Sequence, residues 1–374
     1  MKFTITTAVL QDMMSKATKG ASCDGQRPLT GLIAIELKEN VLTLITSSAT
    51  NYLYVSRPNI TGDDFYIVVP VEIFAKLVSK LTAENTTLEL KDDNLIVKSG
   101  GTYTIAASIN EEGELTKYPN PLNSDEFNTP KNSKNYDIKK TTFNLMLAVN
   151  SASVAEGEVA KTVPEIYTGY YLSKSIVTTN SINMCGVDIP VSDDVLLLRP
   201  ETVKLTEVFT AENLGIGVND DGRGGKNVLI MAKDEIDCMI VSKLMENAED
   251  YQIDAINELL SSEYESKCSI SKQNMLQALD RLMLFIDKLD DFVLYMTFTN
   301  DGLKLSNKKS SSEEVLNYEA SDNFKPFTCR INVKMLFDQI KAVPGDLVNM
   351  LYGLKQCIKF EDGNITQLIA LITD

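Results

Sequence analysis

The stretch VVPVEIFAKLVSKLTAENTTLELKDDNLIVKSG (68–100) contains the pattern on which the fold prediction rests. An apolar lead-in is followed by a segment whose apolar residues recur at helical spacing, with Ile73, Phe74, Leu77, Val78 and Leu81 on one face. Two alternating runs joined by a turn come next. Helical spacing predicts an amphipathic helix that begins near Val71, and alternation around a turn predicts an antiparallel strand pair.

The same order of elements returns twice along the chain. It recurs in LLLRPETVKLTEVFTAENLGIGVNDDGRGGKNVLIMAK (196–233) and in TCRINVKMLFDQIKAVPGDLVNMLYGLKQCIKFED (328–362). The three predicted helices begin near Val71, Glu201 and Ile331, so the repeat has a step of about 130 residues. Identity between the copies is weak, and the repeat rests on the order of elements.

A second helix recurs with the same step. It is predicted in TTAVLQDMMSKATKG (6–20), in KKTTFNLMLAVNSA (139–152) and in SISKQNMLQALDRLMLFIDK (269–288). Short alternating runs between the helices, such as GLIAIELKENVLTLITSS and DFVLYMTFTNDGLKLSN, contain the turn residues Glu39-Asn40 and Asn300-Asp301-Gly302. These runs predict antiparallel hairpins.

The predicted fold class is therefore α+β, with one module repeated three times. Each module has two helices packed on antiparallel sheets, with roughly eight strands in about 125 residues. Polar sequence at 120–134 and around 249–263 places the boundaries, giving modules at 1–122, 130–250 and 255–374. Three unrelated α+β domains remain the alternative.

Composition is that of a soluble globular protein, with 44% hydrophobic and 24% charged residues. The N-terminus MKFTITTAVL lacks the apolar core of a signal peptide, and no run approaches the roughly 18 apolar residues of a membrane span. We therefore expect a cytoplasmic protein without a membrane partner.

The absence of histidine excludes Ser-His-Asp and Cys-His catalysis and histidine-based metal sites. The cysteines stand singly, without a CxxC pair, which predicts reduced, buried thiols and not a zinc site or a disulfide framework. They are Cys23, Cys185, Cys238, Cys268, Cys329 and Cys357. We expect no catalytic residue, no metal and no cofactor.

The formal net charge of −16 argues against a protein that coats nucleic acid with its whole surface. It leaves open DNA binding through one basic face. Whether lysine and arginine residues cluster on one face decides whether DNA binding is possible.

Several stretches resemble the bacterial beta sliding clamp family, the processivity subunits of replicative polymerases. The resemblance is strongest in the first predicted module, in MKFTI, Arg27-Pro28-Leu29, VLTLITSSATNYLYVS, VPVEIFAKLVSKL and LELKDDNLIVKSG. It weakens through YTGYYLSKSIVTTNSINMCGVDIPV and VSKLMENAEDY, and towards the C-terminus it rests mainly on pattern. The chain resembles a divergent member, and a phage-encoded origin is left open.

This resemblance implies a non-catalytic, ring-forming clamp fold, in which two copies with three modules each enclose duplex DNA. Helices line the hole and sheets form the outer scaffold. The implied partners are double-stranded DNA without sequence preference, the replicative DNA polymerase, a clamp loader and a second copy of the chain. An acidic clamp-fold hub or decoy that does not encircle DNA is the alternative.

A sliding ring needs weak, sequence-independent attraction to phosphates. All six predicted helices carry basic residues, which favours a role in lining the hole, although ordinary solvated helix faces also explain each one. The expected DNA-binding residues are Arg27, Lys16, Lys19, Lys76, Lys80, Lys139, Lys140, Lys204, Arg281, Lys334 and Lys341. Arg27 stands where the resembled family keeps a DNA-contacting arginine.

The family's apolar partner-peptide pocket lies between the second and third modules. The resemblance assigns it to Tyr167, Thr179, Ser181, Asn183, Met184, Ile253, Ile369, Ala370, Leu371 and Ile372. The sequence departs from the family pattern at Asn180, Ile182 and Asn183, where Asp, His and Arg are usual, and in the ending LIALITD. These departures predict a different partner motif, and a buried core strand is the alternative for LIALI.

For ring closure the resemblance places Leu77, Leu81 and Ile109 on one side of the dimer interface, and Leu284 and Phe285 on the other. LMLFI (282–286) extends an apolar run around more of its helix than one core face requires. A subunit contact explains that excess, and so does a wholly buried helix.

DDGRGGK (220–226) lacks the GxxxxGK[ST] spacing of a phosphate loop and predicts a hairpin turn instead. A histidine-free hydrolase or nuclease with carboxylate-bound metal is a further alternative to a binding protein.

Overall fold

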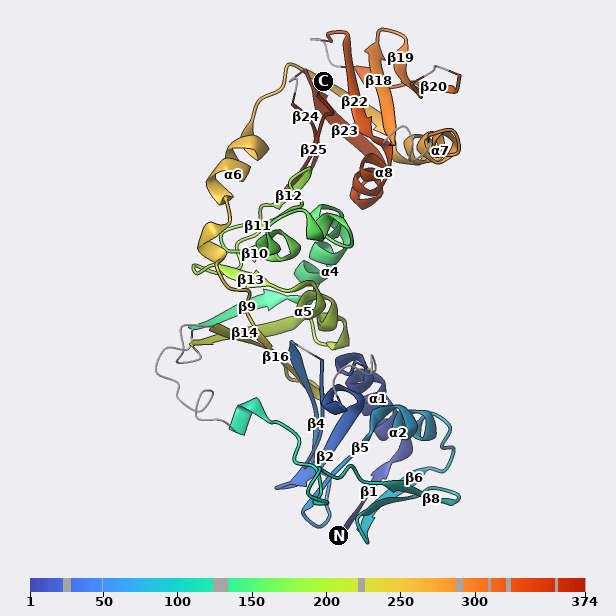
Figure 1. Cartoon of the computed structure of the whole chain (residues 1–374), viewed down its shortest axis with the longest axis vertical. Helices are drawn as coiled ribbons and strands as arrows, with labels where there is room; N and C mark the ends of the chain where they lie inside the picture. Colours follow the sequence, from blue (N-terminus) through green and yellow to red (C-terminus); the bar gives the residue numbers. More distant parts are fainter. Residues whose placement is uncertain are drawn as a thin grey trace. The chain divides into compact units, whose positions relative to one another are not determined.

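The computed structural model describes residues 1–22, 28–48, 50–123, 134–220, 226–286, 292–308, 311–320, 324–353 and 356–373. The chain forms two compact units. Unit 1 comprises residues 1–143 and 201–244, and unit 2 comprises residues 144–200 and 245–374. Figure 1 shows the chain as alternating sheets and short helices, in agreement with the predicted α+β class.

Unit 1 contains two antiparallel sheets. The larger has eight strands in the order β5-β2-β3-β4-β16-β15-β14-β9, and the smaller has the order β1-β6-β7-β8. The larger sheet consists of β2 (Leu32–Lys38), β3 (Val41–Ser47), β4 (Asn51–Pro58), β5 (Phe65–Pro70), β9 (Lys134–Lys139), β14 (Asn213–Asp220), β15 (Lys226–Ala232) and β16 (Asp237–Lys243). The smaller sheet consists of β1 (Lys2–Thr6), β6 (Asn85–Lys91), β7 (Asn94–Lys98) and β8 (Thr102–Ala106).

The helices of unit 1 are α1 (Thr7–Ala17), α2 (Val71–Val78) and α5 (Pro200–Leu205). Helices α1 and α2 lie together beside the larger sheet (Figure 1). Leu10 and Met13 of α1 and Phe74 and Val78 of α2 are fully buried. Gln11 joins the two helices, because its Nε2 donates to the carbonyls of Val78 and Leu81, both at 3.0 Å.

Unit 2 also contains two antiparallel sheets, with the orders β13-β10-β11-β12-β25-β24-β23-β17-β21 and β20-β19-β18-β22. The first consists of β10 (Tyr170–Leu172), β11 (Ile176–Thr179), β12 (Asn183–Val187), β13 (Leu196–Leu198), β17 (Ser266–Ser271), β21 (Glu319–Ala320), β23 (Leu347–Tyr352), β24 (Cys357–Asp362) and β25 (Ile365–Ala370). The second consists of β18 (Val293–Thr299), β19 (Gly302–Ser306), β20 (Glu313–Leu316) and β22 (Phe327–Asn332).

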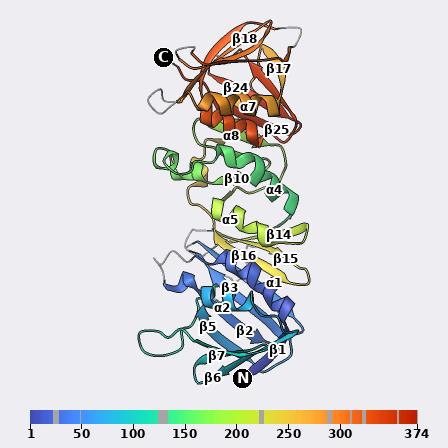
Figure 2. The same cartoon turned by 90° about the vertical axis from the view of Figure 1, so that its right-hand side faces the viewer.

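Helices α7 (Lys272–Met283) and α8 (Val333–Ala342) pack side by side against the strands of unit 2 (Figure 2). Asn332 caps α8, because its Oδ1 accepts from the backbone N–H groups of Lys334 and Met335, both at 3.1 Å. The remaining helices are α4 (Lys140–Val149), which runs from unit 1 into unit 2, and α6 (Ile253–Ser261).

Helices are present at all six predicted places, and the predicted hairpins are confirmed. Glu39 and Asn40 both have positive φ (53° and 62°), which a two-residue type I′ turn requires. β14 pairs with β15, with Asp220 opposite Lys226, as the hairpin reading of DDGRGGK predicts, although 221–225 lie outside the described residues.

The two compact units divide the second predicted module (130–250) between them. The physical reason is sheet continuity, because β16 pairs with β4 across the first predicted boundary and β12 pairs with β25 across the second. The stretch 249–263, expected as a polar boundary, contains helix α6. The three-module division remains a prediction.

All five cysteines within the described residues are buried and free, as predicted, and Cys23 lies outside them. Burial raises the pKa of Cys238 to about 11, and the pKa values of Cys268 and Cys329 to about 12. These thiols are therefore protonated at neutral pH. No helix in the described ranges is long and apolar enough to cross a membrane.

Replacing Gly20 is expected to destabilise unit 1. A Cβ at Gly20 would lie 2.5 Å from Thr46 Oγ1 and 2.6 Å from Leu53 Cβ. We expect Gly20→Ala to lower the free energy of unfolding by about 1–3 kcal/mol, because the contact overpacks a buried site. Gly31→Ala is the matched control, since a Cβ there meets nothing within 4 Å. Urea denaturation of both variants measures the difference, and equal midpoints would contradict the prediction.

Candidate DNA-facing helices, peptide pocket and closure surface

Six of the predicted DNA-binding lysines are exposed, on or beside helices. They are Lys19, Lys80, Lys139, Lys204, Lys334 and Lys341. Lys80 follows α2, and Lys334 and Lys341 lie on α8. The Lys334 ammonium lies 3.7 Å from the centre of the Phe292 ring, so a cation–π contact holds it at the surface. These six residues have the solvated charge that a weak phosphate contact needs.

Lys76 and Arg281 are exposed but engaged with carboxylates. Lys76 Nζ lies 2.5 Å from Glu72 Oε1, and hydrogen bonding to the lysine lowers the pKa of Glu72. Arg281 donates from Nε and Nη2 to the two carboxylate oxygens of Glu314, at 2.7 and 2.9 Å. The guanidinium lowers the pKa of Glu314, so this carboxylate stays ionised at a lower pH than an ordinary glutamate does. Both cations are locally neutralised.

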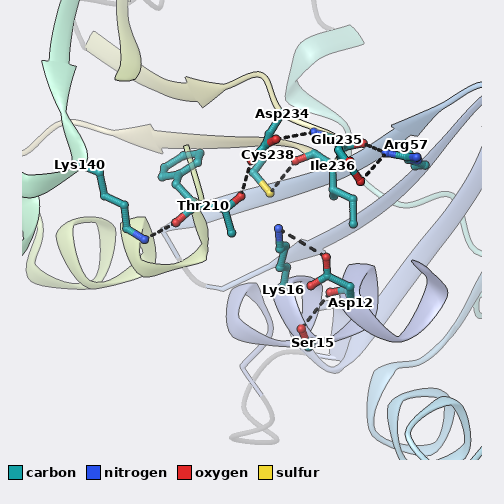
Figure 3. A network of polar contacts seen from close by, with 11 residues as sticks. Asp12, Ser15, Lys16, Arg57, Lys140, Thr210, Asp234, Glu235, Ile236 and Cys238 are labelled. Carbon is teal, nitrogen blue, oxygen red and sulfur yellow. Dashed lines mark hydrogen bonds and ion pairs between the residues drawn. The ribbon is translucent and has the colours of Figure 1, made fainter. Parts of the chain in front are cut away.

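Lys16 is buried and Lys140 is half-buried, so neither has the exposed ammonium group of the six lysines above, and their binding to DNA stays a prediction. Lys16 is 8% exposed, and its Nζ lies 3.8 Å from Asp12 Oδ2. Figure 3 shows Lys16 extending from α1 towards Cys238, while Lys140 donates to the carbonyl of Phe209. Sequence periodicity misses this burial because strands β3 and β4, distant in sequence, pack against α1, and Cys238 of β16 lies near the end of the Lys16 side chain. Arg27 lies outside the described residues.

The residues expected at the dimer interface differ in exposure. Leu284 and Phe285, directly after α7, are 81% and 60% exposed, and Ile109 is 63% exposed. A wholly buried helix therefore does not explain the apolar run LMLFI (282–286). Leu282 and Ile286 are buried, but Leu284 and Phe285 between them are not. Leu77 is half-buried and Leu81 is buried.

Ile73 was expected on the core face of α2 and is instead 56% exposed. The reason is that α2 has only eight residues and buries Val71, Phe74 and Val78. Exposed apolar side chains also lie on two edge strands, Tyr103 on β8 and Val315 on β20. Sequence reasoning did not single out Ile73, Tyr103 or Val315 as surface residues.

The turn between β11 and β12 brings together four predicted pocket residues, Thr179, Ser181, Asn183 and Met184. Ser181 has a φ of 71°, and Asn180 Oδ1 accepts from the backbone N–H groups of Ile182 and Asn183 at 3.0 and 2.7 Å. Thr179 Oγ1 donates to the Asn183 carbonyl at 3.0 Å. The turn is therefore held by its own side chains.

Strand β25 lies directly beside this turn. Ile369 stands opposite Asn183, and the Ala370 N–H donates to the Ile182 carbonyl at 2.9 Å. Ile369 is fully buried, as the core-strand alternative for LIALI predicts, whereas Ala370, Leu371 and Ile372 are half-buried. Leu371 packs on the C-terminal core, and the Ile372 N–H donates to the Arg330 carbonyl at 2.8 Å.

Met184 belongs to an apolar cluster built on three tyrosines. Tyr251 packs on Tyr167 and Tyr171, with ring centres 5.3 and 4.9 Å apart. Met184 and Ile253 are half-buried against this cluster. The structure thus brings together the predicted residues Tyr167, Met184 and Ile253, and adds Tyr171 and Tyr251.

A cleft of about 530 Å³ adjoins Tyr167. Its charged residues are Glu165, Arg199, Glu246 and Asp250, and Arg199 Nη1 lies 3.5 Å from Glu165 Oε1. Of the predicted pocket residues only Tyr167 lines this cleft. Sequence reasoning missed Glu165 and Arg199, which carry no local signal because the fold alone places them beside Tyr167. Among the described residues no three His, Cys, Asp or Glu side chains gather as a metal site.

Comparison with solved structures identifies the fold. The chain has the fold of the DNA polymerase III beta subunits, the sliding-clamp fold, along its whole length. This confirms the predicted resemblance and the predicted clamp fold class. No family model and no curated protein matches the sequence.

Individual beta subunits show how far the sequence has diverged. The beta subunit from the DNA polymerase of Streptococcus pyogenes is 17% identical, with a TM-score of 0.83 and 100% of both chains covered. The DNA polymerase sliding clamp from Bacillus subtilis is 16% identical, with a TM-score of 0.80, covering 100% of this chain and 99% of that one. The DNA polymerase III beta subunit from Thermotoga maritima is 16% identical, with a TM-score of 0.76 and the same coverage.

Proposed function

We propose that the chain is a DNA sliding clamp, a non-catalytic processivity factor that closes as a homodimeric ring around duplex DNA. The observation that carries the proposal is the full-length match to sliding clamps with TM-scores of 0.76 to 0.83. In this function, retention on DNA comes from enclosure. The protein needs only weak attraction to phosphates, without base readout.

The exposed helix lysines support the proposal. Lys19 and Lys80 of unit 1 and Lys334 and Lys341 of unit 2 present ammonium groups to solvent. Solvated lysines attract phosphates through ionic contacts that exchange readily with counterions. The net charge of −16 requires that acidic residues dominate other surfaces, where they oppose binding of DNA to the outside of a ring.

Ring closure is supported by exposed apolar groups and unpaired strand edges. Leu284 and Phe285 of unit 2, and Ile73 and Ile109 of unit 1, expose apolar side chains. Strands β8 and β20 are edges of their four-stranded sheets among the described residues, and an edge strand offers a row of backbone donors and acceptors for pairing. A contact between unit 1 of one copy and unit 2 of another would cover both features.

The peptide pocket would tether the replicative polymerase and receive the clamp loader. The tyrosine cluster with Met184 and Ile253 supplies apolar surface for a hydrophobic anchor of a short peptide. Asn180, Ile182 and Asn183 replace charged family residues, so the peptide motif is expected to rely less on charge.

Met184→Ala is expected to separate polymerase tethering from DNA retention. Removing a half-buried anchor contact should weaken polymerase binding by about tenfold, because one apolar side chain contributes roughly 1.5 kcal/mol. Primer extension on a long template measures the loss of processivity. The variant should keep the oligomeric state of the parent and its retention on circular DNA. Unchanged polymerase stimulation would contradict the pocket assignment.

A topological experiment tests the proposed function. The protein is loaded on nicked circular DNA with its loader, and the circle is then cut at one site. A clamp stays on the circle and runs off the linear product. Retention on both forms would instead indicate a groove binder. Failure to load at all would favour the alternative of an acidic interaction hub. An activity screen with magnesium and manganese tests the hydrolase reading.

A further inference from the structure

Unit 2 contains a second cleft, of about 510 Å³, whose lining includes Asn183 of the predicted peptide pocket and Lys341 of the predicted DNA-binding residues. It lies between the end of α4, the 3-10 turn Asn150–Ser153, the β11–β12 turn and α8. Ala152, Val154 and Met335 give it apolar walls. Asn183, Glu156, Asp338 and Lys341 are the polar residues that matter for its chemistry.

Asn183 carries an unsatisfied acceptor at this cleft. The side chain is 1% exposed, and its Nδ2 donates to the Ala152 carbonyl at 3.4 Å. That contact fixes the amide orientation, because the reverse orientation would bring two oxygens together. Asn183 Oδ1 is buried and accepts from no described residue. Asn180 differs, since its Oδ1 accepts two backbone N–H groups. Buried acceptors are normally satisfied, so Asn183 lacks a donor.

The charged residues that line the cleft are acidic on balance. Glu156 from the loop and Asp338 and Lys341 from α8 are its charged residues, so two carboxylates and one ammonium leave a net charge of −1. No described residue forms an ion pair with Asp338 within 4 Å. Desolvation raises the pKa of Asp338, while Lys341 and Lys334 act in the opposite direction. The cleft therefore presents more acceptors than donors.

We propose that this cleft binds an alkylammonium group, the chemistry shared by a lysine side chain and a free aliphatic amine. The apolar walls accept the methylene stem, and Asn183 Oδ1 with the two carboxylates accepts the ammonium protons. The net charge of −1 matches a single cationic centre, which favours a lysine side chain presented by a partner polypeptide over a diamine. The inference is independent of DNA encirclement.

Titration of the full chain with small probes tests the proposal. The probes are Nα-acetyl-lysine methylamide, its uncharged counterpart Nα-acetyl-norleucine methylamide, and 1,4-diaminobutane, followed by NMR shifts of the asparagine side-chain amides. We expect saturable binding of the lysine probe with a Kd on the order of millimolar, and at least about threefold weaker binding of the norleucine probe.

Two cleft variants and one control identify the site. Asn183→Leu and Asp338→Asn should each weaken binding of the lysine probe by about threefold to tenfold. Asn183→Leu conserves side-chain size and removes the unsatisfied acceptor, so it should fold, which thermal unfolding verifies. Asp193→Asn removes an exposed carboxylate that does not line the cleft and should leave binding unchanged.

The relative affinities of the three probes show whether the bound amine comes from a partner polypeptide or is a free amine. Preference for the lysine probe supports a partner polypeptide, and stronger binding of the diamine with the same sensitivity to the variants supports a free amine. The absence of saturable binding, or binding that neither variant changes, overturns the proposal. The titration contains no DNA, so a negative result would not contradict the clamp function. A protein that is not retained on DNA would likewise not contradict the amine site.

Discussion

The double variant Leu284→Asp, Phe285→Asp is expected to be a folded monomer that is not retained on circular DNA. Both side chains are largely exposed in the single chain, so their replacement removes little core packing. In a closed ring each would be buried against the partner, where an apolar side chain contributes roughly 1.5–3 kcal/mol. Two buried carboxylates would add a desolvation cost. We therefore expect the dimer dissociation constant to rise at least about a thousandfold.

Light scattering coupled to size exclusion measures the mass, and the circular-DNA assay measures retention. Leu347→Asp is the matched control, because Leu347 is also an exposed apolar residue of unit 2 and is not assigned to the interface. The control should keep the mass of the parent. A double variant that also keeps it would refute the closure surface and, with it, the enclosure of DNA by two copies.

Local patterns predicted the elements of this fold well. Two-residue turns between alternating runs predicted hairpins such as β2–β3, because a type I′ turn and strand twist are determined within a few residues. Helices α1, α2, α7 and α8 follow apolar spacing for the same reason. Helix α6 was missed, although Ile253, Ile256 and Leu260 recur at helical spacing, because the polar residues around them favoured a boundary.

The orientation of single residues within those elements was harder to predict. Lys16 is buried because strands distant in sequence pack against α1, and Ile73 is exposed because the short helix α2 buries only one stripe. Arg281 has its bidentate partner, Glu314, on strand β20, far away in sequence. Each outcome depends on a long-range contact, and periodicity within one segment contains no information about such contacts. The predicted pocket residues were brought together only in part for the same reason.

Reversing the charge of three helix lysines is expected to impair DNA loading without shortening retention. The variant combines Lys19→Glu, Lys80→Glu and Lys204→Glu. All three side chains are exposed, so the fold should not change. Loss of solvated cations reduces phosphate attraction and counterion release, so loading at moderate salt should fall at least about tenfold and its salt dependence should become shallower.

The control for this prediction has the same net charge but different positions: Lys38→Glu, Lys91→Glu and Lys174→Glu, all exposed and away from the helices. If only total charge matters, both triple variants will load equally poorly, and the helices will have no special role. If the helices face the duplex, only the first variant will load poorly. Molecules of that variant that do load should still leave only through a cut end, because an enclosing ring retains DNA by topology and the lysines act on entry.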